Sequence, residues 1–192
     1  MIKYPNGKKF YKTKSITRAP ISTANRGMNL EGDINDSNFY YKEKGLCLVT
    51  KRPTPINVVT VDYKNGARIT NAYFEKQSTT DYNGVYKGKY IDFEAKSTHS
   101  NSSLPLSNIP SQQIEHLKEV IKHKGIAFFI IEFSLKNEVY FLDALVLINY
   151  IENSSAKSIP YSFIKEKGKL IKQGYHPRLD YLPIIEEFYF NN

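Results

Sequence analysis

Apolar and polar positions along the chain predict a mixture of helices and strands. From Arg26 to about Lys44 apolar residues recur at mixed spacings of three and four, which predicts an imperfect helix that ends at Gly45. The run IAFFIIEF at 126–133 suits a strand that is covered on both faces. The same patterns predict strands at 46–50 and 138–143, a helix at 112–123 capped by Ser111, and further helices toward the C-terminus.

A long β-hairpin is predicted in the segment before residue 75. Two runs rich in β-branched residues, 56–63 and 67–74, are separated by Lys64-Asn65-Gly66, and Asn-Gly is a strong hairpin signal. Pro53 and Pro55 hold the chain before it in an extended conformation. A two-stranded ribbon is only marginally stable alone. We therefore expect this one to pack on something or to serve as a projecting arm.

Strict alternation follows at 90–96, YIDFEAK, after predicted turns at Asn83-Gly84 and Lys87-Gly88. Alternate side chains of a strand point to opposite faces. One face is therefore expected to carry Tyr90, Asp92, Glu94 and Lys96, and the other Ile91, Phe93 and Ala95. The first of these faces collects the polar groups.

Positive charge is concentrated in two segments of a chain whose formal net charge is +8. Residues 1–25 contain no acid and six cations, which are Lys3, Lys8, Lys9, Lys12, Lys14 and Arg18. In 51–76 the cations Lys51, Arg52, Lys64, Arg68 and Lys76 outweigh the acids Asp62 and Glu75 by three. We interpret 1–25 as a flexible basic arm and expect a polyanion, most naturally nucleic acid, as the partner. Basic tails also aid solubility, which is the alternative.

Composition narrows the class and the compartment. The chain has 192 residues, of which 41% are hydrophobic, so it can bury a substantial core. No apolar run approaches the roughly 18–20 residues of a membrane span, and the N-terminal sequence lacks a secretory pattern. We expect a cytoplasmic, nucleoid-associated protein with no membrane partner. The single cysteine, Cys47, excludes an internal disulfide and is interpreted as a small core residue.

Candidate chemistry lies in a D-x12-E-x-K pattern formed by Asp81, Glu94 and Lys96. Two converging carboxylates can hold Mg²⁺, and a neighbouring ammonium can orient water or stabilise phosphorane charge, so phosphodiester hydrolysis is possible. Asp92 lies on the same face and is an alternative ligand. The alternative to a catalytic role is that these are solvated strand residues and that Asp81 forms an Asx turn.

Five separated segments resemble the RecU family of Holliday junction resolvases. They are NRGM at 25–28, KRPTP at 51–55, QSTTDYNGVYKGKYIDFEAK at 77–96, QIEHL at 113–117 and GYHPRLDY at 174–181. The resemblance implies a PD-(D/E)XK, restriction-endonuclease-like α/β fold, with a mixed central β-sheet flanked by helices and a projecting hairpin stalk at about 56–74. It also implies that 26–192 is the nuclease domain. Residues 151–160 match none of the family's sequence motifs.

The family pattern adds residues that the physical argument does not select. It implies that Mg²⁺, with Mn²⁺ as a possible substitute, is held by Thr79, Asp81, Glu94 and Gln113, with Lys96 as the transition-state stabiliser. Taken alone, Thr79 is typical of a turn hydroxyl and Gln113 of a helix N-terminus. Expected DNA contacts are Arg26, Lys51 and Arg52, with Lys64 and Arg68 on the stalk. Glu31 is a further, weaker active-site candidate.

The function implied by this resemblance is resolution of four-way DNA junctions by paired nicks in recombination and repair. The implied partners are junction DNA and a second copy in a homodimer, with a recombinase and a branch-migration helicase as further candidates. Two alternatives remain at this stage. One is a sequence-specific restriction-type endonuclease with the same core, and the other is a non-catalytic junction-binding accessory protein.

Overall fold

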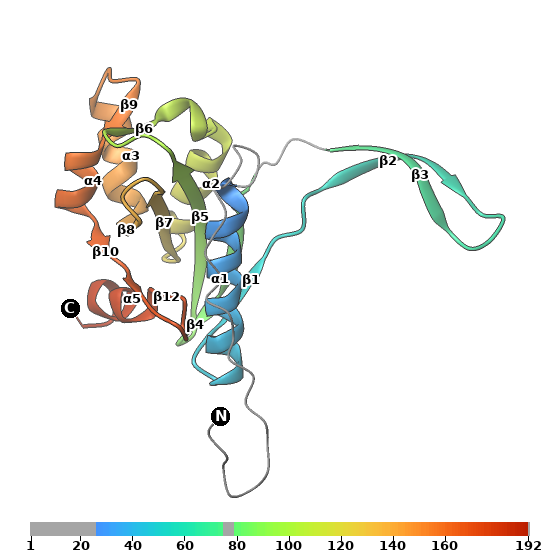
Figure 1. The fold of residues 1–192 in the computed structure, drawn as a ribbon, viewed down its shortest axis with the longest axis horizontal. Helices are drawn as coiled ribbons and strands as arrows, with labels where there is room; N and C mark the ends of the chain where they lie inside the picture. The colour runs from blue at the N-terminus through green and yellow to red at the C-terminus, as the bar shows by residue number, and fades with distance from the viewer. Residues whose placement is uncertain (1–25, 75–78, 192) are drawn as a thin grey trace, which may run out of the picture.

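A six-stranded mixed sheet organises the protein (Figure 1). The computed structural model describes residues 26–74 and 79–191. The strand order is β1-β4-β5-β7-β8-β10, with β5 and β7 parallel and every other pair antiparallel. The strands are β1 (Leu48–Lys51), β4 (Tyr82–Tyr86), β5 (Lys89–Thr98), β7 (Ile126–Phe133), β8 (Glu138–Asp143) and β10 (Lys169–Leu170).

Helices cover the two faces of this sheet. One face packs α1 (Arg26–Glu43) and α5 (Leu182–Tyr189), and the other packs α2 (Ser111–Lys122), α3 (Ala144–Asn153) and α4 (Tyr161–Lys167). Strand β7 shows why both layers are needed: Phe128 belongs to the first core cluster and Phe129 to the second, and both are fully buried. The predicted fold of a mixed sheet flanked by helices is confirmed.

Strand β1 lies closer to β4 than a side chain on the facing residue would allow. A Cβ at Gly84 would lie 2.1 Å from the carbonyl oxygen of Leu48, so only glycine fits there. Asn83-Gly84 therefore lies inside β4, and the predicted turn at this pair is wrong. The turn between β4 and β5 is at Lys87-Gly88, whose φ angles are 46° and 77°.

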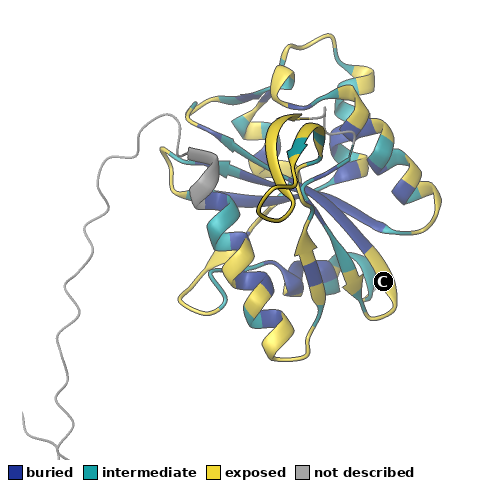
Figure 2. Ribbon diagram, turned by 90° about the vertical axis from the view of Figure 1, so that its right-hand side faces the viewer, coloured by how far each residue is buried: buried dark blue, intermediate teal, exposed yellow. Residues whose placement is uncertain are grey.

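The predicted hairpin is confirmed and it projects from the body (Figure 1). Strands β2 (Ile56–Asp62) and β3 (Arg68–Phe74) pair antiparallel, with register irregularities between Val58 and Val61. Every residue of β3 is exposed, and the hairpin is almost wholly exposed in Figure 2. We call residues 56–74 the stalk. Apart from the half-buried Val61, its large apolar side chains are exposed in the described part of this chain.

The remaining elements are short. The α1 helix is confirmed, but α2 begins after Pro110 without a side-chain cap, so the predicted Ser111 cap is wrong. Other elements are β6 (Ser103–Pro105), the 3₁₀ turn η2 (Leu106–Asn108), β9 (Ser158–Pro160), β11 (Lys172–Gln173) and β12 (Leu179–Asp180). β6 pairs with β9 in a separate two-stranded sheet, so the end of the segment 151–160 forms a strand. The predicted arm at 1–25 lies outside the described residues. No helix in the described ranges is long and apolar enough to cross a membrane.

Candidate active site

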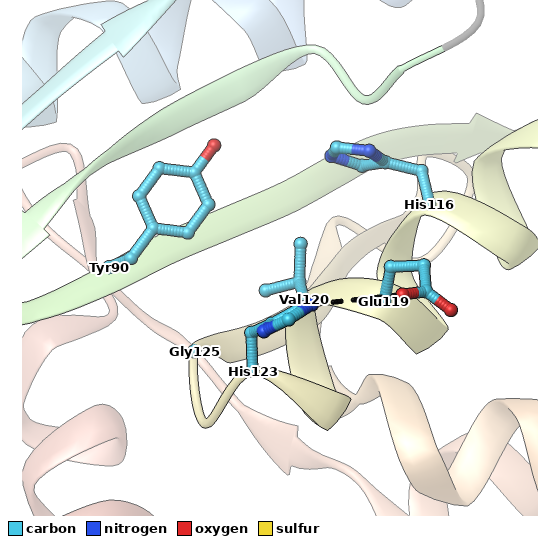
Figure 3. Close-up of a pocket in the computed structure, with 6 residues that line it drawn as sticks. All are labelled: Tyr90, His116, Glu119, Val120, His123 and Gly125. Carbon is cyan, nitrogen blue, oxygen red and sulfur yellow. Dashed lines mark ion pairs between the residues drawn. The ribbon is translucent and has the colours of Figure 1, made fainter.

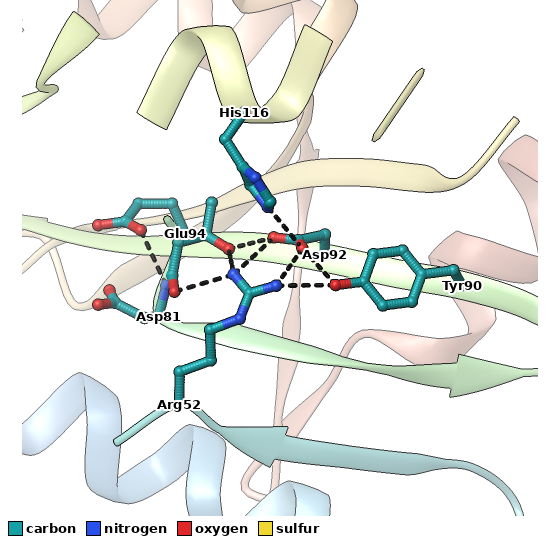
Figure 4. A network of polar contacts seen from close by, with 7 residues as sticks. Arg52, Asp81, Tyr90, Asp92, Glu94 and His116 are labelled. Atoms are coloured by element: carbon teal, nitrogen blue, oxygen red, sulfur yellow. Dashed lines mark hydrogen bonds and ion pairs between the residues drawn. The ribbon is translucent and has the colours of Figure 1, made fainter. Parts of the chain in front are cut away.

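Asp81 and Glu94 meet because β4 and β5 pair immediately beside them. Tyr82, the residue after Asp81, is paired with Phe93, the residue before Glu94. The backbone N–H of Asp81 donates to Glu94 Oε2 at 3.0 Å, and that of Ala95 donates weakly to Asp81 Oδ2 at 3.4 Å. Figure 4 shows the two carboxylates side by side. The residues between Asp81 and Glu94 thus form the β4–β5 hairpin, and strand pairing brings its two ends together.

Glu94 is buried beside a cation. Only 1% of the residue is exposed, and Lys96 Nζ donates to Glu94 Oε1 at 2.6 Å. Burial raises the pKa of Glu94 to about 7; Lys96 lowers this pKa and the neighbouring Asp81 raises it. The Lys96 side chain is itself 16% exposed. Burial therefore opposes ionisation of Glu94, and Lys96 offsets only part of that effect on its pKa.

Gln113 and Thr79 are the two predicted ligands with neutral oxygens. Gln113 lies in the first turn of α2, which packs on β5 and β7, and Thr79 is half-buried two residues before Asp81. Gln113 is 4% exposed, and its Oε1 has no hydrogen-bond partner among the described residues. A buried amide oxygen without a donor is costly unless something else binds it.

These residues fit a hard divalent cation. The set consists entirely of oxygen donors, two of them carboxylates, which is the chemistry that Mg²⁺ prefers. Within 26–74 and 79–191, no group of three or more His, Cys, Asp and Glu side chains could hold a metal ion. A site here would therefore have to combine the two carboxylates with neutral oxygens and water, and Gln113 Oε1 is a buried neutral oxygen without a hydrogen-bond partner among the described residues.

Arg52 is the centre of a partly buried polar network next to these residues (Figure 4). Its Nη2 donates to Asp92 Oδ2 at 2.6 Å and to the Tyr90 hydroxyl at 2.7 Å. Its Nη1 donates to Thr80 Oγ1 at 2.7 Å, and more weakly to Asp92 Oδ1 at 3.4 Å. The fork thus spans from β5 to the loop that carries Asp81.

Asp92 is fully buried and surrounded by donors. Besides Arg52, it accepts hydrogen bonds from the Thr80 hydroxyl and from the Tyr90 hydroxyl at 2.8 Å, and His116 Nε2 lies 2.9 Å from Oδ2. Its oxygens are engaged by the protein itself. This arrangement favours a structural role over the alternative of Asp92 as a metal ligand.

The predicted DNA contacts have different environments. Lys51 Nζ forms an ion pair of 2.5 Å with Glu31 Oε2, and Arg52 is held as described above. Lys64 and Arg68 are exposed on the stalk. Arg26 is the first residue of α1, and its side chain is outside the described part. The four cations with described side chains are therefore divided between the stalk's base, where they are ion-paired, and the stalk itself.

A pocket of about 350 Å³ lies on the same face, beyond this network (Figure 3). It is lined by Tyr90, His116, Glu119, Val120, His123 and Gly125. Tyr90 is at the start of β5 and His123 follows the end of α2, so the pocket lies at the opposite end of these elements from Gln113 and Lys96. It shares Tyr90 and His116 with the network but includes none of the predicted metal ligands.

Sequence reasoning misses the roles of Thr80 and His116. Strand alternation places Tyr90 and Asp92 on the polar face. Nothing in the local pattern pairs them with Arg52, which precedes the stalk in the sequence. His116 does lie within the QIEHL segment at 113–117, which is the available signal. Its contact with Asp92 depends on how α2 packs on β5.

Comparisons with known proteins identify relatives of this chain. The family model described as RecU, Recombination protein U, matches residues 25–187. The chain is 48% identical over 198 aligned positions to a Bacillus cereus (strain G9842) protein named Holliday junction resolvase RecU, covering 99% of each. It is likewise 48% identical to a Geobacillus kaustophilus protein of that name, covering 98% of each. A solved structure of Archaeoglobus fulgidus Hjc, titled a Holliday junction resolvase, aligns with a TM-score of 0.44 and 12% identity, covering 75% of this chain and 95% of that one.

Proposed function

This chain belongs to the RecU family, and on that basis we propose that it is a metal-dependent endonuclease that resolves four-way DNA junctions by paired nicks. The observation that carries the chemistry is the convergence of Asp81 and Glu94 beside Lys96, together with an amide oxygen of Gln113 that lacks a described partner. The name of the relatives supports the substrate class.

We propose Thr79, Asp81, Glu94 and Gln113 as the ligands of Mg²⁺, for which Mn²⁺ could substitute. When bound, the cation would polarise a phosphodiester and make a coordinated water more acidic. A nearby divalent charge would also keep Glu94 ionised, because it opposes the effect of burial on the pKa of that carboxyl. The chain thus supplies a buried Glu94 and a half-buried Asp81 whose negative charge a cation would stabilise.

Lys96 has a different role in this proposal. Its ammonium is held 2.6 Å from Glu94 Oε1 and stays partly exposed, so its remaining N–H groups can reach a phosphate or an attacking water. Charge that develops on the phosphorane in the transition state would be stabilised by this fixed donor. We therefore assign Lys96 to transition-state stabilisation.

DNA binding is proposed for the basic segments and a dimer is proposed for symmetry. Lys64 and Arg68 on the stalk, Lys51 at its base, Arg26, and the basic residues of 1–25 would face the phosphates. Arg52 is the remaining predicted contact, and its guanidinium is engaged by Asp92, Thr80 and Tyr90. A two-fold homodimer would present two sites to a four-way junction. We further propose cytoplasmic, nucleoid-associated action, with recombinase and branch-migration helicase as expected protein partners.

One assay tests the function. End-labelled four-way junction and a linear duplex of one arm sequence are incubated with the protein, with and without Mg²⁺, and products are resolved on a denaturing gel. The proposal expects symmetric nicks in opposed strands of the junction, only with metal. Preferential cutting of the linear duplex would instead indicate a restriction-type enzyme, and the absence of any product with Mg²⁺ or Mn²⁺ would indicate a binding protein.

A further inference from the structure

Arg52 links the base of the stalk to β5 and to the loop that carries Asp81. Arg52 follows the last residue of β1 and precedes the Pro53–Pro55 segment that leads into the stalk, while Thr80 and Asp81 follow the stalk's return. Arg52, which precedes the stalk, therefore contacts Thr80 and Asp81, which follow it.

The contacts are made to the backbone as well as to side chains. The Arg52 backbone N–H donates to the Asp81 carbonyl at 2.7 Å, and its Nη1 donates to the Thr80 carbonyl at 3.2 Å. The same Nη1 reaches the Thr80 hydroxyl, which in turn donates to Asp92. Arg52 thus holds the backbone of two successive residues, Thr80 and Asp81.

Asp92 anchors the other end of the fork. It is fully buried two residues before Glu94 on β5, and the Arg52 side chain is 18% exposed. An arginine fork with a carboxylate has a defined planar geometry, so it fixes orientation as well as distance. Asp81 directly follows Thr80, at one end of this set of contacts. Glu94 lies two residues after Asp92, at the other end.

From this geometry we propose that Arg52, acting through Thr80 and Asp92, is a positioning residue that holds Asp81 and Glu94 at the separation required for metal binding. The inference rests on the proposed function, because it assumes that these two carboxylates are the metal ligands. It changes the interpretation of Arg52, whose guanidinium is committed to the protein. Outer groups that orient metal ligands typically contribute about 10- to 100-fold to metal affinity.

Thr80→Val is the main test, because it is nearly isosteric and leaves the Arg52 cation in place. The affinity for Mn²⁺ is measured by electron paramagnetic resonance on the protein without DNA, so that the readout does not depend on cleavage. We expect Thr80→Val to weaken Mn²⁺ binding by about tenfold, and to raise the Mg²⁺ concentration for half-maximal junction cleavage by a similar factor. Junction affinity, measured by gel shift in EDTA, should stay within about twofold because no phosphate contact is removed.

Matched variants separate positioning from a general loss of stability. Thr98→Val removes another buried threonine hydroxyl, this one on β5, and Arg178→Gln removes another Arg–Asp pair, with Asp33 at 3.0 Å. Neither should change the Mn²⁺ affinity, even if the melting temperature falls. Arg52→Gln should reproduce the metal defect of Thr80→Val, and its defect should be non-additive with it in the double variant.

The outcomes separate the positioning role from the proposed function. If the wild type cleaves junctions and Thr80→Val binds Mn²⁺ with wild-type affinity, the positioning role is wrong while the proposed function stands. If Arg52→Gln loses junction affinity in EDTA but keeps its Mn²⁺ affinity, Arg52 acts as a DNA contact instead. If the wild type neither binds Mn²⁺ nor cuts DNA, the proposed function itself fails.

Discussion

Asp81 donates its backbone N–H to the carboxylate of Glu94 at 3.0 Å, while its own side chain stays close enough to raise the pKa of that carboxyl. Two acids are thus held together by backbone pairing in spite of their mutual repulsion. Such an arrangement costs stability in the absence of a cation, and functional sites commonly carry costs of this kind. We therefore expect a divalent cation to stabilise this pair.

Neutralising either acid should separate DNA binding from cleavage. Asp81→Asn and Glu94→Gln remove a charged metal ligand, so we expect junction cleavage to fall by at least about 100-fold. Junction affinity should be retained or increased, because negative charge facing a polyanion is removed. Cleavage gels and gel shifts on the same labelled junction measure the two effects. Glu115→Gln, which changes an exposed acid of α2, is the control. Near wild-type cleavage by either site variant would refute the metal assignment.

Lys96→Met should abolish cutting without abolishing metal binding. The change removes the ammonium beside Glu94 but keeps the length of the side chain, so the transition state loses its fixed donor. We expect a decrease of at least about 100-fold in single-turnover rate at saturating Mg²⁺. Mn²⁺ binding to the free protein should persist. A variant that cuts at the wild-type rate would show that Lys96 is only a strand residue paired with Glu94.

The metal-free protein should lose stability with rising pH because of Glu94. The folded-state pKa of about 7 lies above the ordinary value of 4.5, so the folded state binds the extra proton between these values. The contribution to unfolding free energy therefore falls as pH rises from about 4.5 to 7, by at most about 3 kcal/mol, and is constant above that. Thermal melts in EDTA at pH values of about 5.5 and about 8 should show a smaller decrease for Glu94→Gln than for wild type. Mg²⁺ should restore wild-type stability at the higher pH and have little effect on the variant. Parallel pH profiles of the two proteins would contradict this.

Local patterns predict those parts of this protein that depend on neighbours in sequence. The stalk follows from β-branched runs around Asn65-Gly66, and the polar face of β5 follows from alternation that includes Asp92 and Glu94. A rule based on turn residues fails at Gly84, because the glycine there serves the close approach of β1 rather than a turn. Such patterns do not predict the contacts between Arg52, which precedes the stalk, and the residues that follow it.

The candidate site shows the same division. Asp81, Glu94 and Lys96 can be selected from spacing and chemistry because one hairpin brings them together. Gln113 cannot be selected this way, since it lies on α2, a separate element that packs on β5 and β7. The Arg52 network likewise depends on β1 being the edge strand beside β4, which is a property of the sheet order.

Removal of residues 1–25 should weaken DNA binding without changing its selectivity. This segment contributes six cations and no acid, so its contribution to affinity is electrostatic. Affinity for junction and duplex should fall together, and the slope of log affinity against log salt should decrease by about 0.9 for each phosphate that the protein no longer neutralises. Fluorescence anisotropy over a salt series measures both. A deletion that removed junction preference while sparing duplex affinity would show that this segment reads shape.

Replacement of the outer stalk should remove junction selectivity while preserving the metal site. Residues 58–72 are exchanged for a short Gly-Ser turn, which leaves Arg52 and Thr80 in place. The stalk exposes large apolar groups, among them Val59, Tyr73 and Phe74, and carries the exposed cations Lys64 and Arg68. A bare ribbon of this kind is an aggregation hazard unless a partner covers it. Partner chain and DNA are the available covers in the proposed complex.

The open centre of a four-way junction can receive such a stalk, whereas linear duplex has no equivalent space. We therefore expect the shortened protein to bind Mn²⁺ with wild-type affinity and to bind duplex almost as well as before, but to lose most of its preference for the junction. Circular dichroism first establishes that the variant is folded, and competition between junction and duplex then gives the affinity ratio. Lys64→Gln with Arg68→Gln, in the intact stalk, separates the effect of charge from that of shape: if charge dominates, this double variant should reproduce the loss. An unchanged ratio in the shortened protein would show that shape is recognised elsewhere, with the active-site face as the next surface to test.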